Sequence, residues 1–154
     1  MQDMSVEFES IERSFNSEDI EGSLLILSEK AEAGDAKSQF LLGHGLHMKY
    51  FMDNYGQSVD EDETDEINKK IIYWTTKSAG QGYALAQFSL GSIYSDEDRC
   101  GEVDYIKGLM WSILGSMHST EDTDETINQY IEEHGMSDED IIKAKHLAHE
   151  WQPS

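Results

Sequence analysis

The feature that most constrains the fold is a stretch of sequence that occurs twice. Residues 29–43 align with residues 77–91 without a gap. An internal repeat of this kind is typical of architectures in which each unit buries its apolar face against the next unit. The aligned positions that carry the same residue are Ala31/Ala79, Gly34/Gly82, Ala36/Ala84, Gln39/Gln87, Phe40/Phe88, Leu42/Leu90 and Gly43/Gly91.

A second motif follows each copy, because Lys70-x-x-x-Trp74 recurs as Lys107-x-x-x-Trp111. Each unit is therefore predicted to be two helices, the first with Gln-Phe-x-Leu-Gly and the second with Lys-x-x-x-Trp. Trp74, Trp111 and Trp151 are expected to pack between helices. Apolar residues also recur at the spacing of a buried helical face, at Ile20, Leu24, Leu27 and Ala31, at Ile67, Ile71 and Trp74, and at Ile106, Met110, Ile113 and Met117.

The small residues of the repeat have a mechanical reason to recur. Side chains at Gly43 and Gly91 would hold neighbouring helices apart, so glycine there predicts a close approach of two backbones. Phe40 and Phe88 are expected to fill the space beside these contacts. The glycines that precede the first helices are expected in links that need a positive φ, and they are Gly34 and Gly82.

These residues resemble a known family, the Sel-one-like repeats, which are α-solenoid relatives of the tetratricopeptide repeats. Residues 79–94 are similar to the first helix of that repeat, and residues 104–111 are similar to the second. Residues 56–59, Gly-Gln-Ser-Val, are a weakened form of the family's Gly-x-Gly-Val loop, and residues 136–151 are similar to a closing helix found after the last repeat.

The resemblance implies an all-α fold, an α/α solenoid of about two helix-pair repeats over residues 26–118. Residues 1–33 would form an N-terminal cap and residues 122–151 the C-terminal capping helices, for seven or eight helices in all. Ser137 and Asp140 match an N-cap with its acidic partner. The apolar stripe of the last helix is expected at Ile141, Ala144, Ala148 and Trp151.

Length and composition are consistent with this architecture. The 154 residues are enough for one compact domain over residues 1–154 and too few for two. No stretch approaches the roughly 20 apolar residues of a membrane helix, and the acidic start shows no secretory signal. Cys100 is the single cysteine, so no internal disulfide is expected, and a reducing cytoplasm is the predicted location.

The charge of the chain restricts its partners. The formal net charge is −21, which disfavours direct binding to nucleic acid or to an anionic membrane, because both attract Lys and Arg. A basic protein is the natural complement. An acidic surface that serves only solubility is the other interpretation of the same charge.

No motif in the sequence points to chemistry. Residues 96–107 begin like a calcium loop, but Lys107 stands where a bidentate Glu is required. Two histidine pairs with a spacing of three residues, His44/His47 and His146/His149, lack further ligands in a zinc pattern. We therefore expect no catalytic residues, no metal site and no cofactor.

The candidate site lies in the two links that join the helices of each unit. The link from Gly43 to Trp74 is 11 residues longer than that from Gly91 to Trp111, and its acidic run is expected to be a solvated loop or a helix start. Equivalent links of a solenoid lie on one edge, so their acids should form one negative rim beside exposed aromatic anchors. The predicted partner-binding residues are Tyr50, Phe51, Tyr55, Asp60, Glu61, Asp62, Glu63, Asp65, Glu66, Asp96, Glu97 and Asp98.

Three functions remain open from sequence alone. The first is a non-enzymatic protein-protein interaction module, an adaptor or regulator with a basic protein partner. The second is an immunity or inhibitor protein that neutralises a cationic bacterial toxin such as a nuclease, because acidic links can mimic a phosphate backbone. The third is a metal-binding protein or an enzyme.

Overall fold

The computed structural model describes Arg13 and residues 20–154. The all-α prediction is confirmed for this part of the chain, which contains no strand. The predicted N-terminal cap is described only from Ile20 onward, because residues 1–12 and 14–19 lie outside the described residues. The helices are α2 (Ile20–Glu32), α3 (Ala36–Asp53), α4 (Glu61–Gly80), α5 (Ala84–Tyr94), α6 (Glu97–Cys100), α7 (Tyr105–His118), α8 (Asp124–Glu133) and α9 (Asp138–Glu150).

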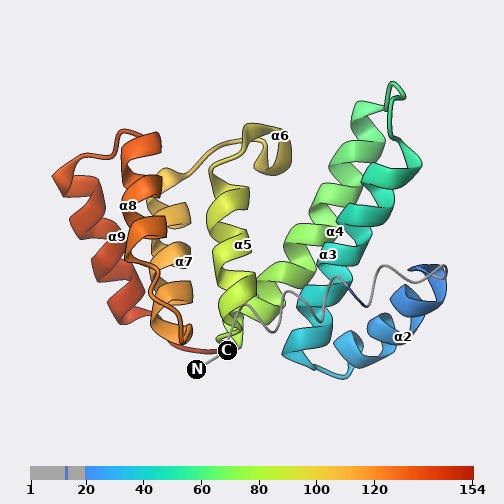
Figure 1. The fold of residues 1–154 in the computed structure, drawn as a ribbon, viewed down its shortest axis with the longest axis horizontal. Coiled ribbons are helices and arrows are strands. Elements are labelled where there is room, and N and C mark those ends of the chain that lie inside the picture. The colour runs from blue at the N-terminus through green and yellow to red at the C-terminus, as the bar shows by residue number, and fades with distance from the viewer. Residues whose placement is uncertain (1–12, 14–19) are drawn as a thin grey trace.

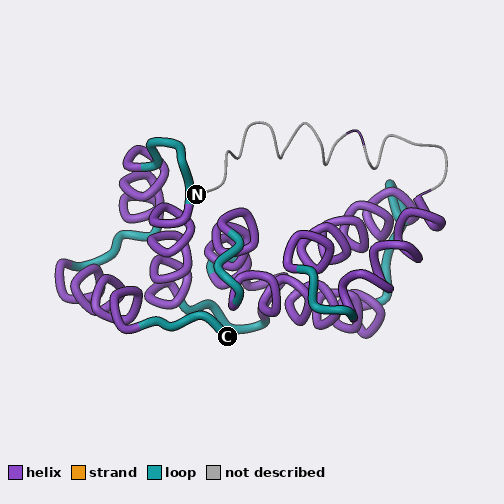
Figure 2. Tube along the Cα trace, turned by 90° about the horizontal axis from the view of Figure 1, so that it is seen from below, coloured by secondary structure: helices purple, strands orange, loops and turns teal. Residues whose placement is uncertain are grey.

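The long helices run alternately up and down (Figure 1). Helix α3 packs on α4, α4 on α5, α5 on α7, and α7 on α9. Figure 2 shows the same succession from below, with the helices side by side along the long axis of the molecule. The links 54–60, 95–104 and 134–137 therefore lie at one edge, which is uppermost in Figure 1 and is called the upper edge below.

The two copies of the repeated sequence form the same turn at the opposite edge. Gly34 has φ 97° and Gly82 has φ 89°, so both occupy the left-handed region that glycine tolerates. Each glycine N–H donates to a carbonyl three residues earlier, to Ala31 O and to Ala79 O, at 3.0 Å in both cases. These turns reverse the chain between α2 and α3 and between α4 and α5.

A buried glutamine closes each of these turns. Gln39 Nε2 donates to Ala31 O at 3.0 Å, and Gln87 Nε2 donates to Ala79 O at 3.1 Å. Both side chains are almost fully buried, where an unpaired amide would destabilise the fold. The aligned Ala/Gln pairs of the sequence thus make the same hydrogen bond twice.

Two glycines set the spacing between paired helices. A Cβ at Gly43 would lie 3.1 Å from Thr75 Oγ1 and 3.3 Å from Ile71 O on α4. A Cβ at Gly91 would collide with Ser112 Oγ and lie 3.1 Å from Gly108 O on α7. The predicted close approach is therefore present in both helix pairs.

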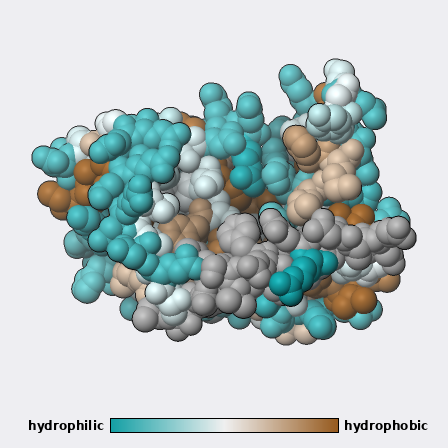
Figure 3. All heavy atoms as spheres, viewed as in Figure 1, coloured by the Kyte–Doolittle hydropathy of each residue, from teal (hydrophilic) through white to brown (hydrophobic). Residues whose placement is uncertain are grey.

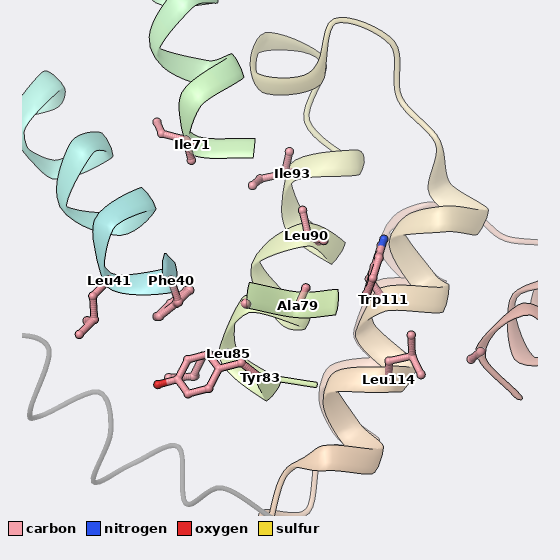
Figure 4. Close-up of a cluster of buried hydrophobic side chains, with 12 residues drawn as sticks. Phe40, Leu41, Ile71, Ala79, Tyr83, Leu85, Leu90, Ile93, Trp111 and Leu114 are labelled. Atoms are coloured by element: carbon pink, nitrogen blue, oxygen red, sulfur yellow. The ribbon is translucent and has the colours of Figure 1, made fainter. Parts of the chain in front are cut away.

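A single core runs through the helices, with side chains from α3, α4, α5 and α7 meeting in Figure 4. The last helix is docked onto it by Ala148, which is buried in the same cluster, while Ala144 is also fully buried. The predicted capping box is confirmed, since Ser137 Oγ accepts from Asp140 N and the Asp140 carboxylate accepts from Ser137 N. Trp151, just beyond the end of α9, packs edge-on against Trp111 with ring centroids 6.3 Å apart.

The predicted apolar stripe of α7 is wrong in part. Met117 is 56% exposed, whereas Leu109, Trp111 and Leu114 are buried. The reason is that α7 packs against α5 on one side and α9 on another, so a single stripe does not describe its buried surface. Phe88 and Trp74 are only partly buried. The Phe88 ring nevertheless lies against α7, because a Cβ at Gly115 would come within 2.8 Å of it.

The acidic insert belongs to a helix. Asp60 caps α4, and the acids that follow it form the first turns of that helix. Helices α3 and α4 have 18 and 20 residues, against 11 and 14 for α5 and α7. The extra sequence therefore lengthens the first helix pair, which projects past α5 at the upper edge (Figure 1).

The close contact at Gly91 gives a stability test. Gly91→Leu should lower the free energy of unfolding by about 1–3 kcal/mol or more, because the side chain meets the α7 backbone at Gly108. Ser92→Leu adds the same side chain one residue further on, at an exposed position, and is the matched control. Chemical denaturation of both variants measures the difference. Equal stability of the two variants would contradict the close packing of α5 on α7.

Candidate functional site

The upper edge brings together the two acidic runs predicted as one rim. The first run lies in the opening turns of α4, and the second lies at α6. They are joined by a hydrogen bond, because Asn68 Nδ2 of α4 donates to Asp98 O of α6 at 3.0 Å. The acids of the two runs are exposed at this edge, namely Asp60, Glu61, Asp62, Glu63, Asp65, Glu66, Asp96, Glu97 and Asp98.

Some of these acids have a local structural reason to be there. Asp60 Oδ1 accepts from Asp62 N at 2.8 Å, and Asp96 Oδ1 accepts from Asp98 N at 3.1 Å. A carboxylate at the N-cap satisfies a free backbone N–H and interacts favourably with the positive end of the helix dipole. Helix capping therefore concentrates negative charge at the edge where α4 and α6 begin.

The predicted aromatic anchors separate into two kinds. Phe51 is 63% exposed and Tyr55 is 78% exposed, and their rings meet edge-on with centroids 6.1 Å apart. Tyr50 differs, because it is partly buried and its hydroxyl makes a 2.6 Å hydrogen bond with Thr64 Oγ1 of α4. Tyr50 holds α3 against α4, whereas Phe51 and Tyr55 form an exposed aromatic tip.

A third part of the upper edge was missed by the sequence analysis. An open hollow of about 580 Å³ lies where the start of α7 meets the link between α8 and α9. Tyr94, Tyr105, Lys107 and His134 line it together with several carboxylates. No sequence signal marks it, because its two sides come from segments about thirty residues apart.

His44 and His47 of α3 lie close enough to Arg99 of α6 for its charge to act on them. Burial lowers the pKa of His44 and of His47 below the ordinary 6.5, and the nearby Arg99 guanidinium lowers both further. Burial also lowers the pKa of Arg99 itself, while Asp96 opposes that change. The first histidine pair is thus kept uncharged near neutral pH.

The residues described here give no metal centre. No group of three or more His, Cys, Asp or Glu side chains in residues 20–154 is placed to hold a metal ion. His146 of the second pair instead lies 3.3 Å from the Glu150 carboxylate. Burial raises the pKa of the Cys100 thiol, which opposes formation of a nucleophilic thiolate.

The described helices include none with the length and apolar character needed to cross a membrane. Comparison with protein-family models, with curated proteins and with solved structures gave no match to this chain. The resemblance to Sel-one-like repeats therefore rests on the residues of the two copies themselves.

The buried imidazoles predict how stability depends on pH. Below about pH 6.5 the unfolded chain binds protons at His44 and His47, while the folded chain resists them because its pKa values are lower. Protonation therefore favours unfolding, and these two groups should lower the melting temperature as the pH falls from about 7 to about 5.5.

Thermal melts across that pH range test this contribution. The variant His44→Gln/His47→Gln should lose less of its melting temperature on acidification than the parent chain. His146→Gln/His149→Gln changes two exposed histidines of α9 and is the control. An equal pH slope for the parent and the first variant would contradict the assignment.

Proposed function

We propose that this chain is a non-enzymatic protein-binding module, an α/α solenoid of two Sel-one-like repeats with capping helices. Helices α3 and α4 form the first repeat, and α5 and α7 form the second. The proposal is supported by the contacts that recur at aligned positions, namely the Gln39 and Gln87 hydrogen bonds and the close approaches at Gly43 and Gly91. Stacked helix pairs of this kind offer extended surface for a partner protein.

The observation that carries the proposal is the meeting of charge and exposed aromatic rings at one edge. Two acidic runs lie beside each other there, joined through Asn68, and Phe51 and Tyr55 project nearby. Hydrophilic residues are prominent along this edge around α6 in Figure 3. Such an arrangement suits a basic protein, because charge accelerates its approach while aromatic residues lengthen the lifetime of the complex.

A second function is favoured by the same row of carboxylates. Successive acids on α4 and α6 present negative charge to a protein that normally binds phosphates, so the chain would act as an immunity protein that blocks a cationic bacterial toxin such as a nuclease. In both cases the proposed location is the cytoplasm. A toxin-like gene next to the gene of this chain would favour the immunity function, and its absence would favour the adaptor function.

The role of the charge is tested by matched neutralisation. Asp60→Asn, Glu61→Gln, Asp62→Asn and Glu63→Gln together should slow association with a partner isolated from cells by about tenfold, and should reduce its salt dependence. Asn at position 60 retains a good helix cap. The control variant makes the same change in net charge at Glu29, Glu32, Glu125 and Glu150, which are exposed elsewhere.

Stopped-flow measurements at two salt concentrations distinguish the two variants. An equal loss in both would show that only the total charge matters and would overturn the upper edge as the binding surface.

The aromatic tip is tested through the dissociation rate. Phe51→Ala/Tyr55→Ala should weaken binding by roughly 2 kcal/mol or more, mainly through faster dissociation, because exposed aromatic residues are typical hot spots. Ile142→Ala on α9 removes a similarly exposed apolar side chain, at 67% exposure, and is the control. Surface plasmon resonance gives both rates. Unchanged dissociation of the double variant would exclude the tip as an anchor.

A further inference from the structure

The hollow at the upper edge has a rigid aromatic side. The ring of Tyr105 stacks on that of His134, with centroids 4.6 Å apart and planes 18° apart. Tyr130 packs edge-on against the same imidazole at 4.5 Å, and its hydroxyl donates to Tyr105 O at 3.2 Å. Burial raises the pKa of Tyr130 to about 12, so this hydroxyl stays protonated and keeps donating. Tyr130 therefore holds the stacked rings of Tyr105 and His134 in place.

The hollow already contains one cation on an aromatic ring. The ammonium of Lys107 lies 4.4 Å from the centre of the Tyr94 ring, within the range of a cation–π interaction. Lys107 belongs to this chain and reaches the ring from the first turn of α7. The Tyr94 ring thus already holds a positive group, which a guanidinium would have to displace or lie beside.

Three carboxylates line the same hollow and outnumber that lysine, namely Glu102, Asp104 and Asp140. Asp104 uses Oδ1 to cap α7 by accepting from Lys107 N, and Asp140 uses Oδ2 in the capping box of α9. The second oxygen of each, Asp104 Oδ2 and Asp140 Oδ1, makes no hydrogen bond with the described residues. The hollow therefore has more negative than positive side chains, and two of its carboxylate oxygens are available to accept hydrogen bonds.

We propose that this hollow binds an arginine side chain of a basic partner protein. The inference rests on the proposed function and deepens it by adding a specific pocket to the acidic edge. A guanidinium is planar and stacks on flat rings while its N–H groups donate to carboxylates, so it suits stacked rings bordered by acids better than the compact ammonium of lysine does. The volume of about 580 Å³ leaves room for such a side chain beside Lys107.

The position of the hollow fits the remainder of the edge. It is lined by residues 102–104, which follow α6, and by residues 134–136, which precede α9. These segments belong to the links of the upper edge, so the hollow lies on the same side of the molecule as the acidic runs (Figure 1). A basic segment that lies along the acids of α4 and α6 would continue toward the hollow. An arginine there would fix the register of that segment.

A second hollow supplies the control. It has about 780 Å³ and is lined by Asp122, Asp124, Glu125 and Glu132 with two amide side chains, and it contains no aromatic ring. With four carboxylates and no lysine it is more acidic than the first hollow, but it lacks the rings. Glu102→Gln and Glu125→Gln remove the same charge from the two hollows.

The probe is the peptide acetyl-Gly-Arg-Gly-Arg-Gly-amide, added to the full chain at about 150 mM salt and followed by NMR. We expect amide shifts to concentrate in residues 102–107 and 134–136. Glu102→Gln and Tyr94→Leu should each weaken binding by about three- to tenfold. Tyr94→Phe should restore most of the affinity lost in Tyr94→Leu, because it keeps the ring. The same peptide with citrulline in place of arginine, which keeps the shape without the charge, should not bind.

Lysine variants give a result in the opposite direction. Lys107→Met should strengthen binding about threefold or more, because it clears the Tyr94 ring and removes a competing charge. Lys145→Met removes the same charge from an exposed position on α9 and should change the affinity little.

Several outcomes overturn the proposal. No shift at millimolar peptide, shifts centred on other residues, or equal losses from Glu102→Gln and Glu125→Gln would each exclude the hollow as the arginine site. These results would not bear on the acidic runs, because the role of the runs is tested separately, by association of the partner with the variant neutralised at residues 60–63. Conversely, a partner that ignores the α4 acids would overturn the proposed function even if the peptide binds in the hollow.

Discussion

The hydrogen bond from a buried glutamine to the end of the preceding helix is the interaction on which the rest of the structure depends. Gln39 and Gln87 each fix the first helix of a pair to the last turn of the helix before it. An amide buried without that partner would cost about 1–3 kcal/mol. The second half of each amide is also used, because Gln39 Oε1 accepts from Gln81 Nε2 and Gln87 Oε1 pairs with His118 Nδ1, both at 2.8 Å.

These glutamine hydrogen bonds determine where the two helix pairs differ from each other. The glycine turns and buried glutamines fix the edge opposite the upper edge, so the difference in length between the two helix pairs appears at the upper edge. The first helix pair is longer than the second, and its extra turns carry Asp60 and Glu61 together with the exposed Phe51 and Tyr55. The contacts that hold the helices together and the exposed residues of the upper edge thus lie in different parts of the molecule. Substitutions at the upper edge need not disturb the core.

The repeated residues made the helices of the two copies predictable, because glycines that recur within an apolar helical pattern indicate close packing of helices. The burial of Gln39 and Gln87 and their hydrogen bonds were not predicted. The capping box at Ser137 was predictable, since it depends on residues three apart. Individual side-chain contacts between distant segments outside the repeats were not predictable. Adjacency in the sequence groups Tyr50 with Phe51, yet the Tyr50 hydroxyl bonds to Thr64. The buried face of α7 differed from the expected stripe because α9 packs on a second side of that helix.

The hollow was beyond sequence reasoning for a related physical reason. Its rings and carboxylates come from the end of α5, from residues 102–107 and from residues 134–140, which are far apart in the sequence. Asp104 caps α7 and the Asp140 carboxylate accepts from Ser137 N in the capping box of α9, so each acid already has a structural role that explains its presence. Helix capping explains why carboxylates gather where helices begin. In Asp104 and Asp140 it uses only one of the two carboxylate oxygens. Asp104 and Asp140 lie in or just after links of the upper edge, the edge at which α4 and α6 begin. A chain with a net charge of −21 thus concentrates charge where helix dipoles partly offset the repulsion, and a basic partner would offset more of it at the same place.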